Sequence, residues 1–370
     1  MAIAPIRVGI IGANPERGWA ARAHVPALRA LPEYVLTAVG TSRERSAGEA
    51  ARRFGAAHAF TDPRRLAGHP EVDLVVITVK VPAHAELVGA ALAAGKHVYC
   101  EWPLARTTEE AAALVAAAGA ARVRHVIGLQ ARYAPAVAQA RELIAAGRLG
   151  RITAVTVYAA RGKAAGGRIP GWAVYTLDRA NGAGLLEVAG GHTLDAVAHV
   201  LRAELAELVD VSATLAVQHP TATVAETGER VDVTSPDHLL LHGRFANGAL
   251  LSAHIHDGKA GHGHTRIEIS GTEGDLTLLS AGPAGPAGVQ IGELLLLSTA
   301  AGASGPQELP IAARHRLPDP GAEARNVAGL YARLAEDLRE GTRTTPDFTD
   351  GLRLHRLLDT VRASAADGAG

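Results

Sequence analysis

Short apolar segments alternate with longer, helix-like stretches over the first third of the chain. The apolar segments cover residues 6–11, 35–39, 73–78, 97–100 and 124–128, and the helix-like stretches cover residues 19–31, 44–54, 83–94 and 108–120. Continuous apolar strands that alternate with helices are typical of a parallel sheet covered on both faces. We therefore predict an α/β fold that opens with a doubly wound parallel sheet, with its ligand cleft at the carboxyl ends of the strands.

The pattern changes after a helix predicted at residues 135–146. Strand-like segments then follow in clusters, at residues 152–159, 209–217, 238–245, 249–256 and 265–270. Asn247-Gly248 marks a hairpin turn between two of these strands. The segments 281–288 and 300–306 are expected to be exposed loops, and helices at 323–339 and 349–365 end the chain. We predict two domains, 1–128 and 129–370, of which the second is an α+β domain with an antiparallel sheet.

The composition excludes several classes of protein. Hydrophobic residues make up 48% of the 370 residues, so the chain can fold without disulfides or metals. Lys+Arg and Asp+Glu both number 37, which argues against binding to nucleic acid or an acidic membrane by bulk charge, although a local basic patch stays open. The single cysteine, Cys100, excludes an intramolecular disulfide and a multi-cysteine metal cluster. With no targeting segment or membrane-spanning stretch in view, we expect a soluble cytoplasmic protein with no nucleic-acid or membrane partner.

The first predicted strand ends in a candidate dinucleotide loop. Gly12 fits the first glycine of such a loop, where the backbone must come close to a pyrophosphate at a helix N-terminus. Asn14 stands where a second glycine is usual, and asparagine is the next best residue for a left-handed backbone. Gly18 comes later than the usual spacing allows. An ordinary tight turn between strand and helix is the alternative.

The end of the second predicted strand indicates which nucleotide would bind. A carboxylate usually holds the adenosine ribose there, but this chain has Thr41-Ser42-Arg43 and no acid. Arg43 can pair a phosphate bidentately and Ser42 can donate a hydrogen bond. These residues favour NADP(H) over NAD(H), with a solvated arginine at a helix start as the alternative.

Several motifs, taken together, resemble the Gfo/Idh/MocA oxidoreductase family. They are Val8 to Gly12, His84, Ala94-Gly95-Lys96-His97-Val98, Glu101-Trp102-Pro103-Leu104, Gly191-His192-Thr193-Leu194-Asp195 and Ser270-Gly271-Thr272-Glu273-Gly274. Within the family the chain is most similar to the Gal80-like branch. The segments that suggest this are 14–19, 79–84, 101–102, 128–132 and 235–240.

The resemblance implies a fold and a class of reaction. It implies a nucleotide-binding Rossmann domain followed by an α+β domain with a large, open, mostly antiparallel sheet, which forms the substrate pocket on one face and often an oligomer interface on the other. The expected activity is hydride transfer between NAD(P) and a hydroxyl or ketone of a sugar, cyclitol or related polyol, in a homodimer or homotetramer. The residues expected at the cofactor are Gly12, Ala13, Asn14, Trp19, Thr41, Ser42, Arg43, Val79, Lys80, His84, Glu101, Trp102 and Gln130.

The clearest departure from the family pattern lies after the fifth predicted strand. Most members have Glu-Lys-Pro there, with the lysine acting on the substrate hydroxyl, whereas this chain has Glu101-Trp102-Pro103. The indole N–H of Trp102 donates hydrogen bonds but exchanges no proton at neutral pH. Lys80, just past the fourth strand, could replace the missing lysine or anchor the cofactor if it is partly desolvated. A lysine that reaches solvent is the alternative, and Glu101 is expected to keep its place beside the nicotinamide.

The second predicted domain supplies the other candidate catalytic residues. His192 and Asp195 share one face of a helix, and the family places its acid/base histidine and a substrate-contacting aspartate there. The family's catalytic aspartate falls at Val188 in this register, so either an insertion such as Gly190-Gly191 brings Glu187 into place or the carboxylate is absent. A buried helix-capping role is the alternative for His192. Candidate substrate contacts are Trp172, Tyr175, Glu187 and Asp195, with Lys163, Arg132 and Tyr133 as weaker candidates.

Histidines near the end of the strand region also raise the question of a metal. His254 and His256 would share a strand face, His262 and His264 form a second pair, and the segment Gly258 to Gly263 resembles a flexible hairpin loop. The family chemistry needs no metal, so we expect rim or oligomer-contact histidines instead. Two further functions stay open beside the oxidoreductase: a Gal80-like nucleotide-binding regulator without efficient turnover, and a lyase or hydrolase that passes through a transient keto sugar.

Overall fold

The computed structural model describes residues 4–162, 167–201, 207–280, 288–316 and 319–367. The chain forms two compact units. Unit 1 comprises Met1–Gln130 and Leu317–His355, and unit 2 comprises Ala131–Arg316 and Arg356–Gly370. This division differs from the predicted domains in one respect, because a segment near the C-terminus belongs with the first unit.

Unit 1 is built on a six-stranded parallel sheet with the strand order β3-β2-β1-β4-β5-β6. This order is that of a doubly wound Rossmann fold and confirms the predicted class. The strand β3 was not predicted, since three residues carry too little periodicity to be recognised. The strands are β1 (Ile6–Ile11), β2 (Tyr34–Gly40), β3 (His58–Phe60), β4 (Leu74–Ile77), β5 (His97–Glu101) and β6 (His125–Gly128).

Helices cover the parallel sheet of unit 1 and begin at recognisable caps. The Thr107 hydroxyl accepts from the Glu110 amide at the start of α5, and the Asp62 carboxylate caps α3 in the same way. The helices of this unit are η1 (Ala20–His24), α1 (Val25–Arg29), α2 (Glu44–Phe54), α3 (Pro63–Ala67), η2 (Val81–Ala83), α4 (His84–Ala93), α5 (Thr108–Ala121) and α8 (Ala322–Glu340).

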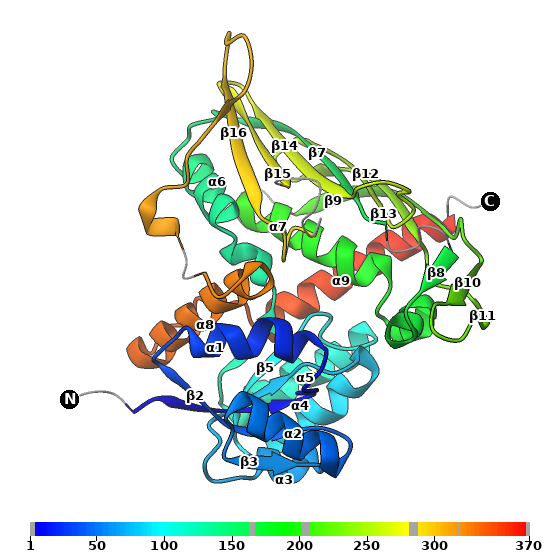
Figure 1. The fold of residues 1–370 in the computed structure, drawn as a ribbon. Coiled ribbons are helices and arrows are strands. Elements are labelled where there is room, and N and C mark those ends of the chain that lie inside the picture. Colours follow the sequence, from blue (N-terminus) through cyan, green and yellow to red (C-terminus); the bar gives the residue numbers. More distant parts are fainter. Residues whose placement is uncertain (1–3, 163–166, 202–206, 281–287, 317–318, 368–370) are drawn as a thin grey trace. The chain divides into compact units, whose positions relative to one another are not determined.

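The helix α8 explains why the C-terminal segment belongs to unit 1. It packs against η1 and α1, beside which it lies in Figure 1. Its inner face buries Tyr331 and Leu334 completely. The Tyr34 hydroxyl donates to the Tyr331 carbonyl at 2.7 Å, which joins the helix to β2. The next helix, α9 (Phe348–Asp367), begins in unit 1 and continues in unit 2.

Unit 2 contains an eight-stranded sheet in the order β17-β16-β15-β14-β7-β13-β12-β9. Every neighbouring pair is antiparallel except β13 and β7, so the sheet is mostly antiparallel, as predicted. The strands are β7 (Ile152–Ala160), β9 (Leu208–Ala216), β12 (His238–Phe245), β13 (Leu250–His256), β14 (His264–Gly271), β15 (Gly274–Ser280), β16 (Leu294–Ala300) and β17 (Gln307–Glu308).

The remaining elements of unit 2 lie beside this sheet. Figure 1 shows α6 and α7 on one face of it. A separate three-stranded sheet has the order β11-β10-β8. The elements are η3 (Gln130–Tyr133, shared with unit 1), α6 (Pro135–Ala145), β8 (Arg168–Ile169), η5 (Gly171–Leu177), η6 (Arg179–Asn181), η7 (Leu186–Gly190), α7 (Gly191–Leu201), β10 (Thr221–Val224), β11 (Arg230–Asp232) and η8 (Ala313–His315).

Two turn predictions had different outcomes in the large sheet. The turn at Asn247-Gly248 is confirmed: Gly248 has a φ of 88°, and the Asn247 side chain accepts from the Ala249 amide. The segment between β13 and β14 is not a hairpin, because both strands pair with β7 and not with each other. The predicted loop at 300–306 follows the last residue of β16, whereas 281–287 lies outside the described residues. None of the helices that the structure describes is long and apolar enough to cross a membrane.

Candidate functional site

The nucleotide edge, as we call the carboxyl ends of β1, β2, β4, β5 and β6, begins at Gly12. This residue has a φ of +97°, and a methyl group added to it would lie 2.9 Å from both Thr78 Oγ1 and Val79 Cγ1. The Gly12 and Ala13 amides both donate to the Gly40 carbonyl, so the chain turns sharply at the end of β1. Only glycine fits this conformation and this approach. The predicted role of Gly12 as the first glycine of the loop agrees with this geometry.

The prediction for Asn14 was wrong in its mechanism. Asn14 is not left-handed, since Arg122 is the residue other than glycine with a positive φ in the described ranges. The Asn14 side chain instead accepts from the amides of Glu16 and Arg17, at 2.9 and 3.1 Å. This side-chain turn closes the loop before Gly18, whose φ is +109°.

Residues at the end of β2 form a short hydrogen-bonded turn. The Thr41 hydroxyl lies 3.0 Å from the Arg43 carbonyl and 2.6 Å from the Ser46 hydroxyl, so Thr41 shapes the turn. Ser42 and Arg43 are exposed. Arg43 also precedes α2 in an extended conformation, which leaves its guanidinium at the surface beside this strand end.

His84 connects the ends of β4 and β5. Its ring is buried, with Nε2 3.0 Å from the Val79 carbonyl and Nδ1 2.8 Å from the Pro103 carbonyl. Burial lowers the pKa of this histidine. A neutral ring donates to one of these two carbonyls, so His84 lies between two loops of the nucleotide edge and is hydrogen-bonded to one of them. Lys80, in the first of these loops, is exposed. The partial burial that would favour Lys80 as a base is therefore not found within unit 1.

Glu101 ends β5 and points to a buried histidine. Its Oε1 atom lies 3.0 Å from His24 Nε2, and its side chain is 12% exposed. A methyl group on Gly128 would lie 2.7 Å from the same oxygen, so a side chain there would displace the carboxylate. Trp102 turns the other way and is buried, with its ring 4.8 Å from that of His355. The indole therefore packs in the core of unit 1 at the position where the family has a lysine.

At the nucleotide edge, the buried atoms Trp19 Nε1 and Gln130 Oε1 lack a partner among the described residues. Trp19 is the N-cap of η1, and Gln130 lies just after β6. Buried polar groups normally find hydrogen bonds, and a ligand commonly satisfies those that do not. An unpaired donor, an unpaired acceptor and the Gly12 turn together fit a dinucleotide at the nucleotide edge.

His192 is the first functional side chain of unit 2. It lies on α7, is buried, and its Nδ1 atom has no partner among the described residues. Burial and the positive charge of Arg161 lower the pKa of His192 from 6.5 to about 3. The ring is therefore neutral at physiological pH, and its protonated form is disfavoured in this environment.

Glu187 lies in a π-helical turn that runs into α7. The element η7 inserts one residue per turn, so positions five apart, such as 187 and 192, come to one face. This agrees with the insertion that the sequence analysis considered. The carboxylate of Glu187 is held by Arg362, at 2.7 Å from Oε1, and by the Gly184 amide, at 2.9 Å from Oε2.

Asp195 forms a bidentate ion pair. The Arg132 guanidinium donates to both of its oxygens, at 2.6 and 3.0 Å, and Asp195 is 5% exposed. The pair fixes the carboxylate in place. The aspartate that was predicted to contact substrate therefore already binds an arginine.

The other predicted substrate contacts of unit 2 have mixed surroundings. Trp172 is 56% exposed in η5, which suits a surface platform. Tyr175, in the same element, is half-buried, and burial raises the pKa of its hydroxyl. Lys163 lies outside the described residues.

The histidines of β12 and β13 form a stack of rings on the large sheet. His256 lies parallel to His238 and to His254, with ring centroids 5.0 and 4.7 Å apart. The Tyr158 hydroxyl lies 3.2 Å from His256 Nε2. Burial lowers the pKa of His254 and of His256.

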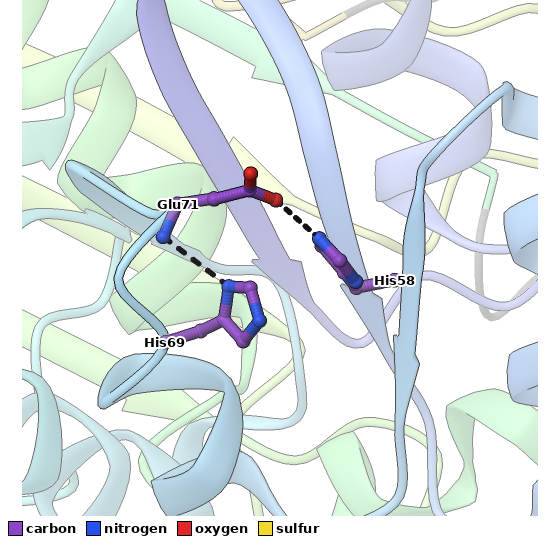
Figure 2. A group of neighbouring side chains, drawn as sticks. All are labelled: His58, His69 and Glu71. Carbon is purple, nitrogen blue, oxygen red and sulfur yellow. Dashed lines mark hydrogen bonds and ion pairs between the residues drawn. The ribbon is translucent and has the colours of Figure 1, made fainter.

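A group with metal-like spacing occurs elsewhere in the described part of the chain, at His58, His69 and Glu71 (Figure 2). His58 Nε2 lies 2.5 Å from Glu71 Oε2, and the Glu71 amide donates to His69 Nδ1 at 3.3 Å. The hydrogen bond from His58 lowers the pKa of the Glu71 carboxyl. These residues lie at the start of β3 and ahead of β4, at the opposite end of the strands from the nucleotide edge. Because His58 and Glu71 contact each other directly, we interpret the group as a surface ion pair.

Sequence reasoning missed His24, Tyr331 and Arg362, which are hydrogen-bonded to or within the support of candidate side chains, and Arg161, whose charge acts on His192. His24 is a polar residue on an otherwise apolar helix face, and Arg161 lies two residues past a predicted strand, so both carried a local signal. Tyr331 and Arg362 lie in the C-terminal helices and carried none.

Comparisons with known proteins find similarity in both parts of the chain. Residues 6–129 match the model of an oxidoreductase family with an NAD-binding Rossmann fold, and residues 135–280 match that of the C-terminal domain of Gal80p. The chain is 28% identical to the galactose/lactose metabolism regulatory protein GAL80 of Saccharomyces cerevisiae, over 99% of this chain and 94% of that protein. It is 33% identical to the 1,5-anhydro-D-fructose reductase of Ensifer adhaerens, over 73% and 74% of the two chains. The solved structure of levoglucosan dehydrogenase with NADH and L-sorbose is similar, with a TM-score of 0.84, 26% identity and coverage of 98% and 97%.

Proposed function

This chain belongs to the Gfo/Idh/MocA oxidoreductase family, in its Gal80-like branch, and on that premise we propose that it is an NADP(H)-dependent enzyme acting on a sugar, cyclitol or related polyol. Membership makes the chain a dehydrogenase or reductase of CH–OH groups. The proposed reaction is transfer of a hydride to or from a secondary hydroxyl or ketone. The observation that carries the proposal is the nucleotide edge, where the Gly12 turn, the unpaired Gln130 oxygen and the Glu101 carboxylate follow or end strands of one parallel sheet at its carboxyl edge.

The residues of the nucleotide edge would hold and orient the cofactor. The backbone at Gly12 leaves room for a pyrophosphate, and Trp19 and Gln130 offer a donor and an acceptor. When bound, the nicotinamide supplies the hydride acceptor or donor. Lys80, exposed in the β4–α4 loop, is the candidate for anchoring the cofactor or the reacting hydroxyl.

The preference for NADP(H) rests on the end of β2. The exposed Arg43 guanidinium can pair a 2′-phosphate, Ser42 can donate to it, and no carboxylate stands there to hold a ribose hydroxyl. The NADH complex of levoglucosan dehydrogenase makes NAD(H) the competing choice. The ratio of kcat/KM for the two cofactors decides between them.

His192 is the proposed partner of the reacting hydroxyl. Its ring is neutral because burial and Arg161 disfavour the imidazolium, so it can accept a hydrogen bond and a proton. The same environment disfavours the imidazolium form of His192. We therefore expect His192 to release the proton soon after it accepts it. Asp195 can still accept from a substrate hydroxyl, since a carboxylate has lone pairs beyond those that Arg132 occupies.

Two observations favour a second function, that of a nucleotide-binding regulator. The buried Trp102 replaces the family's lysine, and the similarity to the regulatory protein GAL80 extends over 99% of this chain. A regulator would bind NADP(H) without converting a sugar. The two functions therefore differ in turnover and not in nucleotide binding.

The test is nicotinamide absorbance during incubation with NADP+ or NAD+ and a panel of anhydrosugars, aldoses and cyclitols. The reduced cofactors would be tested in parallel with the corresponding ketones. We expect turnover of at least one sugar, greater with NADP(H), that is lost in His192→Ala and reduced in Lys80→Ala. Tight nucleotide binding with no turnover across the panel would overturn the enzyme and favour the regulator.

A further inference from the structure

The carboxylate of Glu101 is the exposed end of a buried hydrogen-bonded chain in unit 1. Glu101 Oε1 lies 3.0 Å from His24 Nε2, and His24 Nδ1 lies 2.8 Å from the Tyr331 hydroxyl. His24 and Tyr331 have no exposed surface, whereas the Glu101 side chain keeps 12%. The chain therefore runs from the interior of unit 1 to its nucleotide edge and ends on an acid.

The contacts determine which nitrogen of His24 carries the proton. Burial raises the pKa of the Tyr331 hydroxyl well above its usual range, so the phenol keeps its proton. The ionised carboxylate of Glu101 can only accept, so the facing Nε2 carries the proton of a neutral imidazole, and the lone pair of Nδ1 accepts from the phenol. That N–H points at Glu101 Oε1 and donates to the carboxylate. One arrangement of protons thus satisfies both hydrogen bonds without a buried positive charge.

The surrounding rings hold this chain in one conformation. The Tyr99 ring stacks on Tyr331 with centroids 5.2 Å apart, and the His24 ring lies edge-on to Tyr99 at 5.1 Å. The Tyr34 hydroxyl donates to the Tyr331 carbonyl and anchors the backbone of α8. On the other side, the lack of a side chain at Gly128 leaves room for the carboxylate. Rotation of the imidazole would break contacts on both sides, so it has a single well-packed orientation.

We propose that His24 and Tyr331 are positioning residues for Glu101: the phenol holds the imidazole by its Nδ1 atom, and the imidazole holds the carboxylate at the nucleotide edge by its Nε2–H. The role of Glu101 in hydride transfer rests on the function proposed above. The arrangement also gives α8 a part in the site, because Tyr331 belongs to a helix 307 positions away from His24 in the chain. With Trp102 turned into the core, Glu101 is the ionisable group that β5 presents at this edge.

Three substitutions separate positioning from packing. His24→Leu keeps an apolar volume but removes the donor to Glu101, while His24→Gln keeps a side-chain N–H that can reach it. Tyr331→Phe keeps the ring and removes the hydroxyl that is hydrogen-bonded to Nδ1. We expect His24→Leu to lower kcat about 10- to 100-fold with KM changed little, His24→Gln to recover most of this loss, and Tyr331→Phe to have an intermediate effect.

Thermal unfolding of the same variants excludes the trivial explanation. If His24 only packs the core, activity follows the melting temperature and His24→Leu performs at least as well as His24→Gln. That result would overturn the proposal. A wild-type kcat retained in His24→Leu would overturn it as well.

A second measurement needs no turnover, so it stays decisive if the enzymatic function fails. Nitrogen-15 spectra of histidine-labelled protein report which ring nitrogen is protonated, and the signal of His24 is assigned by its absence in His24→Gln. We expect the Nε2-protonated tautomer in the wild-type protein and a shifted Nδ1 resonance in Tyr331→Phe, where no phenol donates to Nδ1. An Nδ1-protonated ring, or a His24 signal unchanged in Tyr331→Phe, would contradict the proposed positioning of Glu101 by His24 and Tyr331, even if the enzyme turns over sugars normally.

Discussion

The two units differ in how the polar side chains of their candidate sites are paired, although unit 2 also holds a buried atom without a partner among the described residues, His192 Nδ1. At the nucleotide edge of unit 1, Trp19 Nε1 and Gln130 Oε1 are buried without a partner in the described part of the chain, and Glu101 is supported from behind and open in front. In unit 2, the acids around His192 already have partners: Asp195 is held by Arg132 and Glu187 by Arg362. Unpaired buried groups indicate where a ligand binds, whereas paired acids indicate which side chains are kept in position.

Breaking an ion pair of unit 2 should have the largest effect. Arg132→Met leaves Asp195, which is 5% exposed, as a buried carboxylate without its arginine. We expect the free energy of unfolding to fall by about 3–5 kcal/mol in urea titrations. The matched control is Arg266→Met, which breaks an exposed pair with Glu268 and should cost about 0–1 kcal/mol. Equal effects of the two substitutions would show that burial does not distinguish these pairs.

Filling the turn of unit 1 should abolish nucleotide binding. Gly12→Val places a side chain at a φ of +97° and against Thr78 and Val79. We expect at least about 100-fold weaker NADPH binding, or about 3 kcal/mol, in fluorescence titrations. Gly89→Ala, on α4 with open space around it, is the control and should bind normally. Unchanged binding in Gly12→Val would place the nucleotide elsewhere.

The buried histidines of unit 2 predict a loss of stability in acid. Burial and neighbouring arginines lower the pKa values of His192 and His199 from 6.5 to about 3. Below pH 6.5 these histidines bind protons in the unfolded chain but not in the folded unit. The free energy of unfolding is therefore highest above pH 6.5 and falls as the pH drops toward 3. At about pH 5 each group accounts for a loss of about 2 kcal/mol.

Substitution of one of these histidines tests the pH dependence. His199→Gln should reduce the loss of unfolding free energy between neutral pH and about pH 5 by about 2 kcal/mol. His262→Gln, at an exposed position, should leave the pH dependence as it is. A pH profile of stability that is the same in all three proteins would show that His199 can be protonated in the folded unit.

The smallest expected effect concerns the choice of cofactor. Arg43→Ala removes the guanidinium beside the predicted 2′-phosphate, and we expect KM for NADP+ to rise about 10-fold, or about 1.4 kcal/mol, with little change for NAD+. Arg45→Ala, also exposed on α2, is the control. A parallel change for both cofactors would contradict the proposed NADP(H) preference.

The sequence was most informative where the physical cause is local. The parallel sheet, the Gly12 turn and the hairpin at Asn247-Gly248 follow from apolar periodicity and from backbone needs that one or two residues express. Asn14 shows the limit of such reasoning, because its side chain closes the loop in place of a left-handed backbone. For Glu187 the sequence left two alternatives, an insertion that brings it into place or a missing carboxylate. The π-helical turn agrees with the insertion.

Contacts between distant segments could not be predicted from the sequence. The hydrogen bond between His24 and Tyr331 joins positions 307 residues apart, and the pairing of Glu187 with Arg362 joins positions 175 apart. No local pattern records such partners, since each depends on how helices pack after the strands have formed. The low pKa of His192 belongs to the same class, because it arises from burial and from Arg161.

The most direct test of the account is transfer of a labelled hydride. Each sugar and cyclitol of the panel would be deuterated at the carbon of its candidate hydroxyl and incubated with NADP+, and the mass of the nicotinamide would be measured in the wild-type protein and in Gly12→Val. The account predicts that the deuterium appears in NADPH for the wild-type protein and not for the variant. Bound NADP+ that stays oxidised and unlabelled with every substrate would contradict it.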